Sequence, residues 1–225
     1  MLRWSPKGSY LVVAGFGASS FEIWETHTWC AAVRAAAAPR YYDAELSRPR
    51  ARPRGCRTCQ RWSTGEHALT DAAWSADEKL VFLALSGSLQ IAALHFVGSA
   101  PSLLAHLLPL ELPGLVSEPP GLRITSLAFD STAGKMAVAC TADETDDAPA
   151  AHMACVYQVQ CSPVVVAKPL GRVASPPADH TAAMRGVAGV AFRAGASAPT
   201  NARAQSAAST LAVSWPDGSV SLAAV

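Results

Sequence analysis

The sequence predicts an all-β protein whose antiparallel four-stranded sheets repeat around an axis as the blades of a β-propeller. Two observations predict this class. An aromatic residue, a polar turn and an apolar run of strand length recur four times, and a second strand-length segment follows each copy. Sheet units repeated at intervals of roughly 40 to 60 residues are typical of propellers. The 225 residues are enough for a partial ring of about four blades.

The four copies align at their aromatic residues, with spacings of 70, 55 and 63 residues. The copies read WSPKGSYLVVA (4–14), WSADEKLVFLA (74–84), FDSTAGKMAVA (129–139), and FRAGAS (192–197) resuming at STLAVSW (209–215). The second segments are FEIWE (21–25), SLQIAAL (88–94), CVYQV (155–159) and SVSLAAV (219–225). The predicted blades therefore span about 1–62, 69–108, 123–168 and 186–225.

The hydrophobic pattern predicts how the strands are covered. The continuous apolar run 80–85 is typical of a strand buried on both faces, whereas segment 21–25 alternates as in a strand with one wetter face. Pro216, Asp217 and Gly218 predict a tight hairpin. Six aromatic side chains are expected to pack sheet against sheet: Trp4, Trp24, Trp74, Phe129, Phe192 and Trp215.

Gly15 and Gly17, with serines close behind, raise the alternative of a phosphate-binding loop and hence a nucleotide-binding enzyme. A dinucleotide fingerprint requires a third glycine where Ser20 stands, followed by a helix. The next residues alternate as a strand instead. We therefore expect the Gly15–Ser20 loop to connect two antiparallel strands.

The order of segments is more specific than any single motif. FEIWETHTW (21–29) is close to a WD-repeat unit with IWE in place of IWD, although the other three blades lack the dipeptide. After it come TCQRW (58–62), DAAWSADEKLVFLAL (71–85), CSPV (161–164), LGRV (170–173) and STLAVSWPDGSV (209–220). In this order the segments resemble the carboxy-terminal half of a WD-repeat nucleoporin, over most of the chain.

This resemblance implies a WD40-type propeller without catalysis: a scaffold of the nuclear pore complex, at the nuclear envelope of the nucleus, supporting nucleocytoplasmic transport and nuclear protein import. The implied partners are other nucleoporins, including a transmembrane nucleoporin of the pore membrane. No catalytic, cofactor-binding or metal-binding residue is expected, nor a small-molecule substrate or direct nucleic-acid contact. The alternative within the same fold is a WD-repeat adaptor of another complex.

Two departures from the resemblance concern chain organisation. Residues 30–57, rich in Ala, Arg and Pro, separate two segments that are nearly contiguous in the family. We expect either a disordered surface insertion or translated intron sequence. The chain also begins at the end of a first blade strand and stops after a third one, which predicts two open blade edges that invite pairing or aggregation.

Composition excludes several classes of protein. The formal net charge of +1 gives no general attraction to nucleic acid or anionic membranes. The start lacks a secretory signal, and the most apolar window, 103–112, is too short to span a bilayer. We expect a soluble chain with no transmembrane segment of its own. Six irregularly spaced cysteines favour a reducing compartment.

Candidate chemical groups are few. Cys56 and Cys59 have the spacing of half a zinc site, but the remaining ligands would have to come from distant residues: His67, Cys140, Cys155 and Cys161. We expect an ordinary thiol pair.

The other candidates are a histidine–aspartate set, in which Asp179 and His180 lie in a loop rich in Pro and Ala, and two charged segments. His152, Asp179 and His180 could serve a hydrolase, but no G-x-S-x-G nucleophile motif accompanies them. The acidic cluster 143–147 fails the calcium-loop spacing and predicts a solvated hairpin tip. The basic run 48–57, near Tyr41 and Tyr42, lacks interleaved aromatics and is expected to be a disordered loop.

Overall fold

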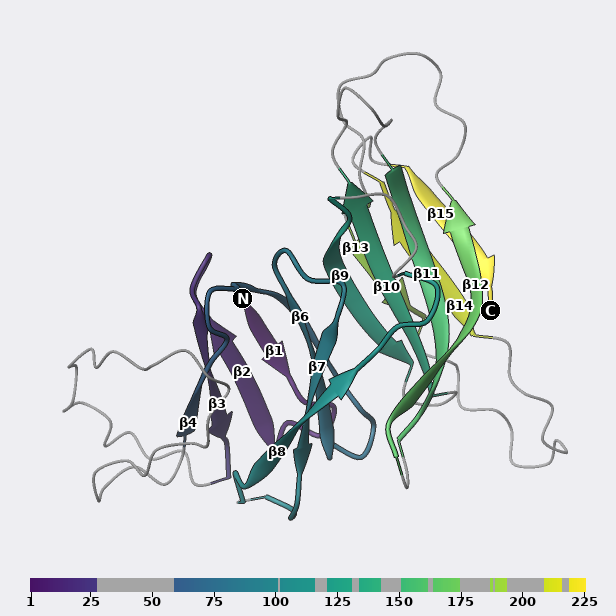
Figure 1. Cartoon of the computed structure of the whole chain (residues 1–225). Helices are drawn as coiled ribbons and strands as arrows, with labels where there is room; N and C mark the ends of the chain where they lie inside the picture. Colours follow the sequence, from purple (N-terminus) through teal and green to yellow (C-terminus); the bar gives the residue numbers. More distant parts are fainter. Residues whose placement is uncertain are drawn as a thin grey trace, which may run out of the picture.

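A computed structural model describes residues 1–27, 59–100, 102–115, 121–130, 134–142, 151–161, 164–174, 187, 189–193, 209–215 and 219–225. Every regular element in these ranges is a β-strand, and all strand pairs are antiparallel (Figure 1). The strands form four separate sheets. The predicted all-β fold class is therefore confirmed.

Each sheet is a meander of consecutive strands. Sheet 1 contains β1 (Leu2–Trp4), β2 (Tyr10–Ala14), β3 (Ser20–Glu25) and β4 (Cys59–Ser63). Sheet 2 contains β5 (Leu69–Trp74), β6 (Leu80–Leu85), β7 (Ile91–Phe96) and β8 (Ala105–Leu110). Sheet 3 contains β9 (Arg123–Asp130), β10 (Lys135–Ala142), β11 (Ala151–Gln160) and β12 (Val166–Ala174). Sheet 4 contains β13 (Gly189–Phe192), β14 (Thr210–Ser214) and β15 (Val220–Ala224).

The four sheets stand face to face in chain order and form an arc that does not close into a ring (Figure 1). Contact between sheets runs through their first strands: β1 touches β5, β5 touches β9, and β9 touches β13. These four strands are therefore the inner strands of the arc. This is the blade arrangement that the repeat predicts.

Burial follows the hydrophobic pattern of the sequence. Strand β6 is buried at five successive positions, and β3 alternates between half-buried and buried side chains. Strand β7 begins at Ile91, three residues later than the segment from position 88 predicts, because Ser88 belongs to a turn in which its hydroxyl accepts the backbone N–H of Gln90 (3.0 Å).

The Gly15–Ser20 loop is a turn between β2 and β3. The Ala18 N–H donates to the Gly15 carbonyl (3.3 Å), and Gly17 has a φ of 66°, which favours glycine. Strand β3 starts at Ser20 and pairs with β2. The phosphate-loop alternative is therefore wrong, since a strand stands where it requires a helix.

A hydrophobic core fills each space between neighbouring sheets. Between sheets 1 and 2, the rings of Tyr10, Trp74 and Phe96 stack with centroids 4.9 to 5.7 Å apart. Between sheets 3 and 4, Trp215 and Leu211 pack against alanines of β10 and β11. Stability therefore depends on burying both faces of each intervening sheet.

The aromatic side chains divide into two groups. Trp74 and Trp215 are buried, and Phe129 and Phe192 are partly buried against neighbouring sheets, as expected. Trp24 is half-buried, on the face of sheet 1 that is turned away from sheet 2. Trp4 is 54% exposed, so its prediction as a core residue is wrong. In sheets 2, 3 and 4 the aromatic side chain at this repeat position packs on the sheet before its own. Sheet 1 is the first sheet of the arc, so no described sheet covers Trp4 on that side.

Several predicted features fall outside the described residues. They are the insertion 30–57 and the turn residues Pro216, Asp217 and Gly218. On either side of that turn, β14 and β15 pair as an antiparallel hairpin, and the Trp215 N–H donates to the Ser219 carbonyl (2.9 Å).

Candidate interaction surface

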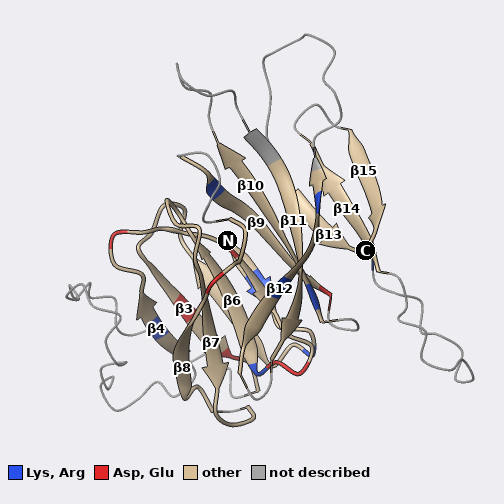
Figure 2. Cartoon of the chain, turned by 45° about the vertical axis from the view of Figure 1, so that its right-hand side comes forward, with Lys and Arg blue, Asp and Glu red and all other residues tan. Residues whose placement is uncertain are grey.

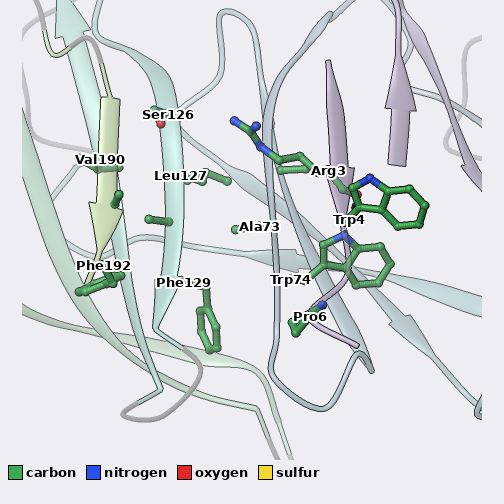
Figure 3. Close-up of a pocket in the computed structure, with 13 residues that line it drawn as sticks. Arg3, Trp4, Pro6, Ala73, Trp74, Ser126, Leu127, Phe129, Val190 and Phe192 are labelled. Carbon is green, nitrogen blue, oxygen red and sulfur yellow. Dashed lines mark hydrogen bonds between the residues drawn. The ribbon is translucent and has the colours of Figure 1, made fainter. Parts of the chain in front are cut away.

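The inner strands of all four sheets meet around a hollow of about 350 Å³ (Figure 3). Its walls come from sheet 1 at one end of the arc to sheet 4 at the other. The lining residues are Arg3, Trp4, Pro6, Ala72, Ala73, Trp74, Ser126, Leu127, Ala128, Phe129, Val190, Ala191 and Phe192. The hollow is the candidate functional site because it is a concave surface to which all four sheets contribute described residues.

The repeat itself explains the shape of the hollow. The residue before the aromatic anchor is Ala73, Ala128 and Ala191 in sheets 2, 3 and 4. Sheet 1 has Arg3 at this position. Three walls are therefore built with small side chains, and the fourth carries a guanidinium group.

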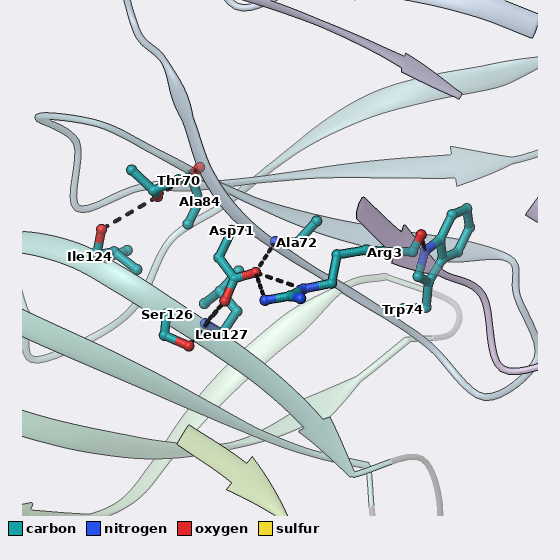
Figure 4. A network of polar contacts seen from close by, with 9 residues as sticks. All are labelled: Arg3, Thr70, Asp71, Ala72, Trp74, Ala84, Ile124, Ser126 and Leu127. Carbon is teal, nitrogen blue, oxygen red and sulfur yellow. Dashed lines mark hydrogen bonds and ion pairs between the residues drawn. The ribbon is translucent and has the colours of Figure 1, made fainter. Parts of the chain in front are cut away.

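Arg3 is held by a carboxylate of the next sheet (Figure 4). Its Nε and Nη2 donate to Asp71 Oδ1 at 2.9 and 2.8 Å. Asp71 is buried, whereas the Arg3 side chain is 49% exposed. Charge-assisted bonds of this geometry fix the guanidinium plane against one wall of the hollow.

The second oxygen of Asp71 reaches sheet 3. Asp71 Oδ2 accepts the Ser126 hydroxyl (3.0 Å) and the Leu127 N–H (2.9 Å), while Oδ1 also accepts the Ala72 N–H (2.8 Å). One carboxylate thus joins the inner strands of sheets 1, 2 and 3. The predictions from sequence did not include Asp71. Its place three residues before Trp74, equivalent to Ser126 before Phe129 in the next copy, becomes visible once the repeats are aligned.

Threonines form a second, repeated link. The Thr70 hydroxyl lies 3.4 Å from the Ile124 carbonyl of sheet 3, and the Thr125 hydroxyl lies 3.5 Å from the Val187 carbonyl beside sheet 4. The two residues occupy the same repeat position. Inner strands of successive sheets are therefore joined at equivalent points.

A further carboxylate joins sheets 1 and 2 at the turn before β6. Glu78 Oε1 accepts the Ser5 hydroxyl (2.5 Å) and the N–H groups of Lys7 (2.7 Å) and Ser9 (3.4 Å). Burial alone would raise the pKa of Glu78, but these hydrogen bonds outweigh it and hold the pKa below its ordinary value of 4.5. The predictions from sequence did not include Glu78 either, since its contacts depend on a neighbouring sheet.

The chemistry of the hollow suits binding. Its lining exposes polar and apolar atoms in about equal measure, and its charged side chain Arg3 is neutralised by Asp71. Trp4 is among the lining residues and is half-exposed. Exposed tryptophan and arginine are the side chains most often found at the energetic centres of protein interfaces. Acidic and basic positions are interspersed over the described sheets (Figure 2), so the surface has no strongly one-signed field there.

The cysteines and histidines of the predicted zinc alternative are dispersed. Cys59 is buried on β4, and His67 lies in the turn before β5 with Nδ1 2.7 Å from the Ser86 carbonyl. Cys140 and Cys155 are buried in the core between sheets 2 and 3. Burial raises the pKa of the Cys161 thiol, and the negative charge of Asp77 raises it further. The described ranges contain no group of three or more potential metal-ligating side chains arranged to hold an ion.

Other sequence candidates are not placed. His152 lies on β11, but its side chain is outside the described set. Also outside it are Cys56, Asp179, His180, the acidic cluster 143–147, and the basic run 48–57 with Tyr41 and Tyr42. In the part of the chain that is described, no helix has the length and apolarity needed to traverse a bilayer.

One curated protein resembles the chain in sequence, and solved structures resemble it in fold. The chain is 28% identical to Aladin of Arabidopsis thaliana over 218 residues, which cover 78% of this chain and 42% of Aladin. It therefore spans less than half of that relative. No protein-family model matches it.

Among solved structures, the β-propeller domain of Cps50 (Swd1) from Myceliophteria thermophila matches with a TM-score of 0.55 at 8% identity, over 100% of this chain and 53% of that one. U3-55K matches with a TM-score of 0.45 at 12% identity, over 98% and 50% of the two chains. The Cps50 match, together with the four sheets, establishes the fold. The chain is thus built of WD40-type β-propeller blades and resembles Aladin in sequence over most of its length.

Proposed function

We propose that the chain is a non-catalytic scaffold component of the nuclear pore complex, at the nuclear envelope, that supports nuclear protein import. The observation that carries the proposal is the sequence similarity to Aladin, which extends over 78% of the chain. The proposed blade division is 1–62, 69–108, 123–168 and 186–225.

The site supports binding as its activity. The hollow combines a fixed guanidinium with walls of small side chains, on inner strands that hydrogen bonds join to one another. Such a rigid surface can recognise a partner without paying a large ordering entropy on association. We propose that the partners are other nucleoporins, including one that spans the pore membrane.

The direct test is imaging of the chain as a fluorescent fusion in eukaryotic cells. We expect a continuous signal at the nuclear rim that coincides with a pore marker. A diffuse cytoplasmic signal from folded protein would contradict the proposal and would favour a WD-repeat adaptor of another complex.

Two variants control for folding. Trp74→Ala removes a buried ring and should abolish the rim signal through misfolding. Phe16→Ala alters a fully exposed side chain in the turn between β2 and β3 and should keep it. If both variants lost the signal although Phe16→Ala kept its strand-rich circular dichroism, the turn itself would be part of the docking surface.

A further inference from the structure

Two histidines lie side by side on the outer pair of strands of sheet 2. His95 is on β7 and His106 on β8, and the strand register places their Cα atoms directly opposite each other. Two residues farther along, the Val97 N–H donates to the Leu104 carbonyl (2.9 Å). Because hydrogen-bonded and non-hydrogen-bonded pairs alternate in an antiparallel ladder, the histidines also form a hydrogen-bonded pair, with Cα atoms about 5.5 Å apart. Both imidazoles therefore leave the same face of the sheet.

The histidine pair stands at the margin of the core between sheets 2 and 3. On the same face, one step toward the middle of the strands, Ala93 is buried in this core and Leu108 packs against it. One step toward the hairpin end, Val97 and Leu104 are 54% and 57% exposed. The histidine of β7 is half-buried and that of β8 is exposed. Solvent thus reaches the pair, while apolar side chains flank it on both sides along the strands.

The two imidazole rings lack polar partners. Within the described part of the chain, no hydrogen bond or ion pair engages the ring of His95 or His106. The ring of His67, in contrast, lies with Nδ1 2.7 Å from the Ser86 carbonyl. The ring nitrogens of the paired histidines are therefore available to a ligand from solution.

The chemistry that suits two neighbouring imidazoles is metal coordination. Neutral imidazole is a common ligand of divalent transition metals, including Zn²⁺, Ni²⁺ and Cu²⁺. Metal–nitrogen bonds of about 2.0 to 2.1 Å require the two donor nitrogens to stand about 3 Å apart. Side chains whose Cβ atoms are about 4.5 to 5.5 Å apart reach this separation by rotating about their own bonds. The backbone therefore already provides the spacing that a shared ion needs.

The charges at this end of sheet 2 favour a cation. Asp77, in the turn that leads into β6, is close enough to Cys161 of sheet 3 for its negative charge to act on the thiol. Lys79 stands opposite Phe96, whose ring packs in the core toward sheet 1, so the lysine side chain leaves the other face of the sheet. The face that carries the histidines is thus spared this positive charge.

We propose that His95 and His106 form a binding site for a divalent transition-metal ion. The described residues supply no group of three ligands, so two imidazoles hold the ion and leave its other coordination positions open. Water, or a side chain of a bound protein, completes the coordination. This site is separate from the proposed role at the nuclear pore, and its test does not depend on where the chain localises.

The test uses Ni²⁺, because imidazole binds it well and because, unlike Cu²⁺, it does not oxidise the six cysteines of the chain. Isothermal titration of the folded chain at neutral pH should show one ion bound more tightly than any other. His95→Gln and His106→Gln should each weaken this binding by roughly tenfold or more, since even outer-shell changes cost that much. His67→Gln, at another exposed histidine, is the matched control and should leave the tight binding unchanged.

The variant that carries both His95→Gln and His106→Gln gives the decisive result. Two ligands of one ion act together, so the double variant should bind Ni²⁺ little more weakly than either single variant. Independent sites predict that the two losses add, and that outcome would overturn the proposal. Equal binding by the unaltered chain and the double variant would overturn it as well. Circular dichroism of each variant verifies that it folds, and an Asn substitution replaces any Gln variant that does not.

Discussion

The contact between sheets 1 and 2 and the contact between sheets 3 and 4 solve the same packing problem with different side chains. The first contains the stacked rings of Tyr10, Trp74 and Phe96. In the second, Ala137 and Ala154 are fully buried and form a smooth wall that receives Trp215. In both contacts the space between the sheets is filled by buried side chains, as close packing requires. The bulky side chains come from both sheets in the first contact and mainly from sheet 4 in the second.

The largest expected effect comes from the aromatic contact. Trp74→Ala removes one of the three mutually stacked rings and the indole N–H that donates to the Arg3 carbonyl (3.3 Å), so it should lower the free energy of unfolding by about 3 to 5 kcal/mol. Urea denaturation measures the change. Trp74→Phe retains a stacked ring and should cost clearly less; equal losses would show that the rings do not determine the stability of this contact.

The contact between sheets 3 and 4, which is built of alanines on the side of sheet 3, should be destabilised by added volume and not by lost volume. Ala139 is fully buried on β10 between sheets 3 and 4, so Ala139→Leu should overpack the wall and cost about 1 to 3 kcal/mol. The matched control is Ala212→Leu on the face of sheet 4 turned away from sheet 3, which should be nearly neutral in the same denaturation assay. A neutral Ala139→Leu would mean that sheets 3 and 4 separate easily.

The polar links sharpen the comparison. Glu78 of sheet 2 has a φ of 62°, a backbone region that favours glycine, and the corresponding turn of sheet 1 carries Gly8 at this position. Its bonds to sheet 1 offset this cost. At the contact of sheets 3 and 4, Asp130 instead accepts a hydrogen bond from the Ser209 hydroxyl and carries no such strain.

Two substitutions at Glu78 separate strain from bonding. Both Glu78→Ala and Glu78→Gly remove the bonds to Ser5 and Lys7, but only glycine relieves the strained φ. We expect both variants to be destabilised, the glycine variant less so by roughly 1 kcal/mol in denaturation midpoints converted to free energy. Equal stability of the two would show that the turn relaxes when the carboxylate is removed.

The smallest expected effect is on pH dependence. Because the pKa of folded Glu78 is lowered, its contribution to stability is present above the ordinary value of 4.5 and is lost as pH falls through the lower folded pKa. The difference in urea midpoint between the unaltered chain and Glu78→Gln should therefore be largest at neutral pH and shrink in acid. Glu66→Gln, at an exposed carboxylate before β5, should leave the midpoint nearly unchanged. A Glu78→Gln difference independent of pH would contradict the assignment.

Much of the fold was predictable because it depends on short-range pattern. The apolar run of β6, the alternation of β3 and the glycine turn before it all lie in the sequence as predicted. Strand β8 escaped prediction, because AHLLPL contains a proline and reads as a general apolar segment until it pairs with β7.

The candidate site was less predictable, because its residues are separated by whole repeats. Asp71 acquires its role only when Arg3 of one sheet and Leu127 of another come within hydrogen-bond distance of it. Trp4 also shows that the pattern does not decide burial. Its motif matches that of Trp74, yet Trp74 is buried and Trp4 is half-exposed.

By itself the sequence determined the repeated strands, their turns and the resemblance to Aladin, because each of these depends on the identity and order of residues that are close together in the chain. Only the tertiary structure decided which faces are covered, where the hollow lies and which carboxylates join the sheets. The physical reason is that a strand's pattern specifies that a face is apolar, whereas its burial depends on the sheet that stands opposite.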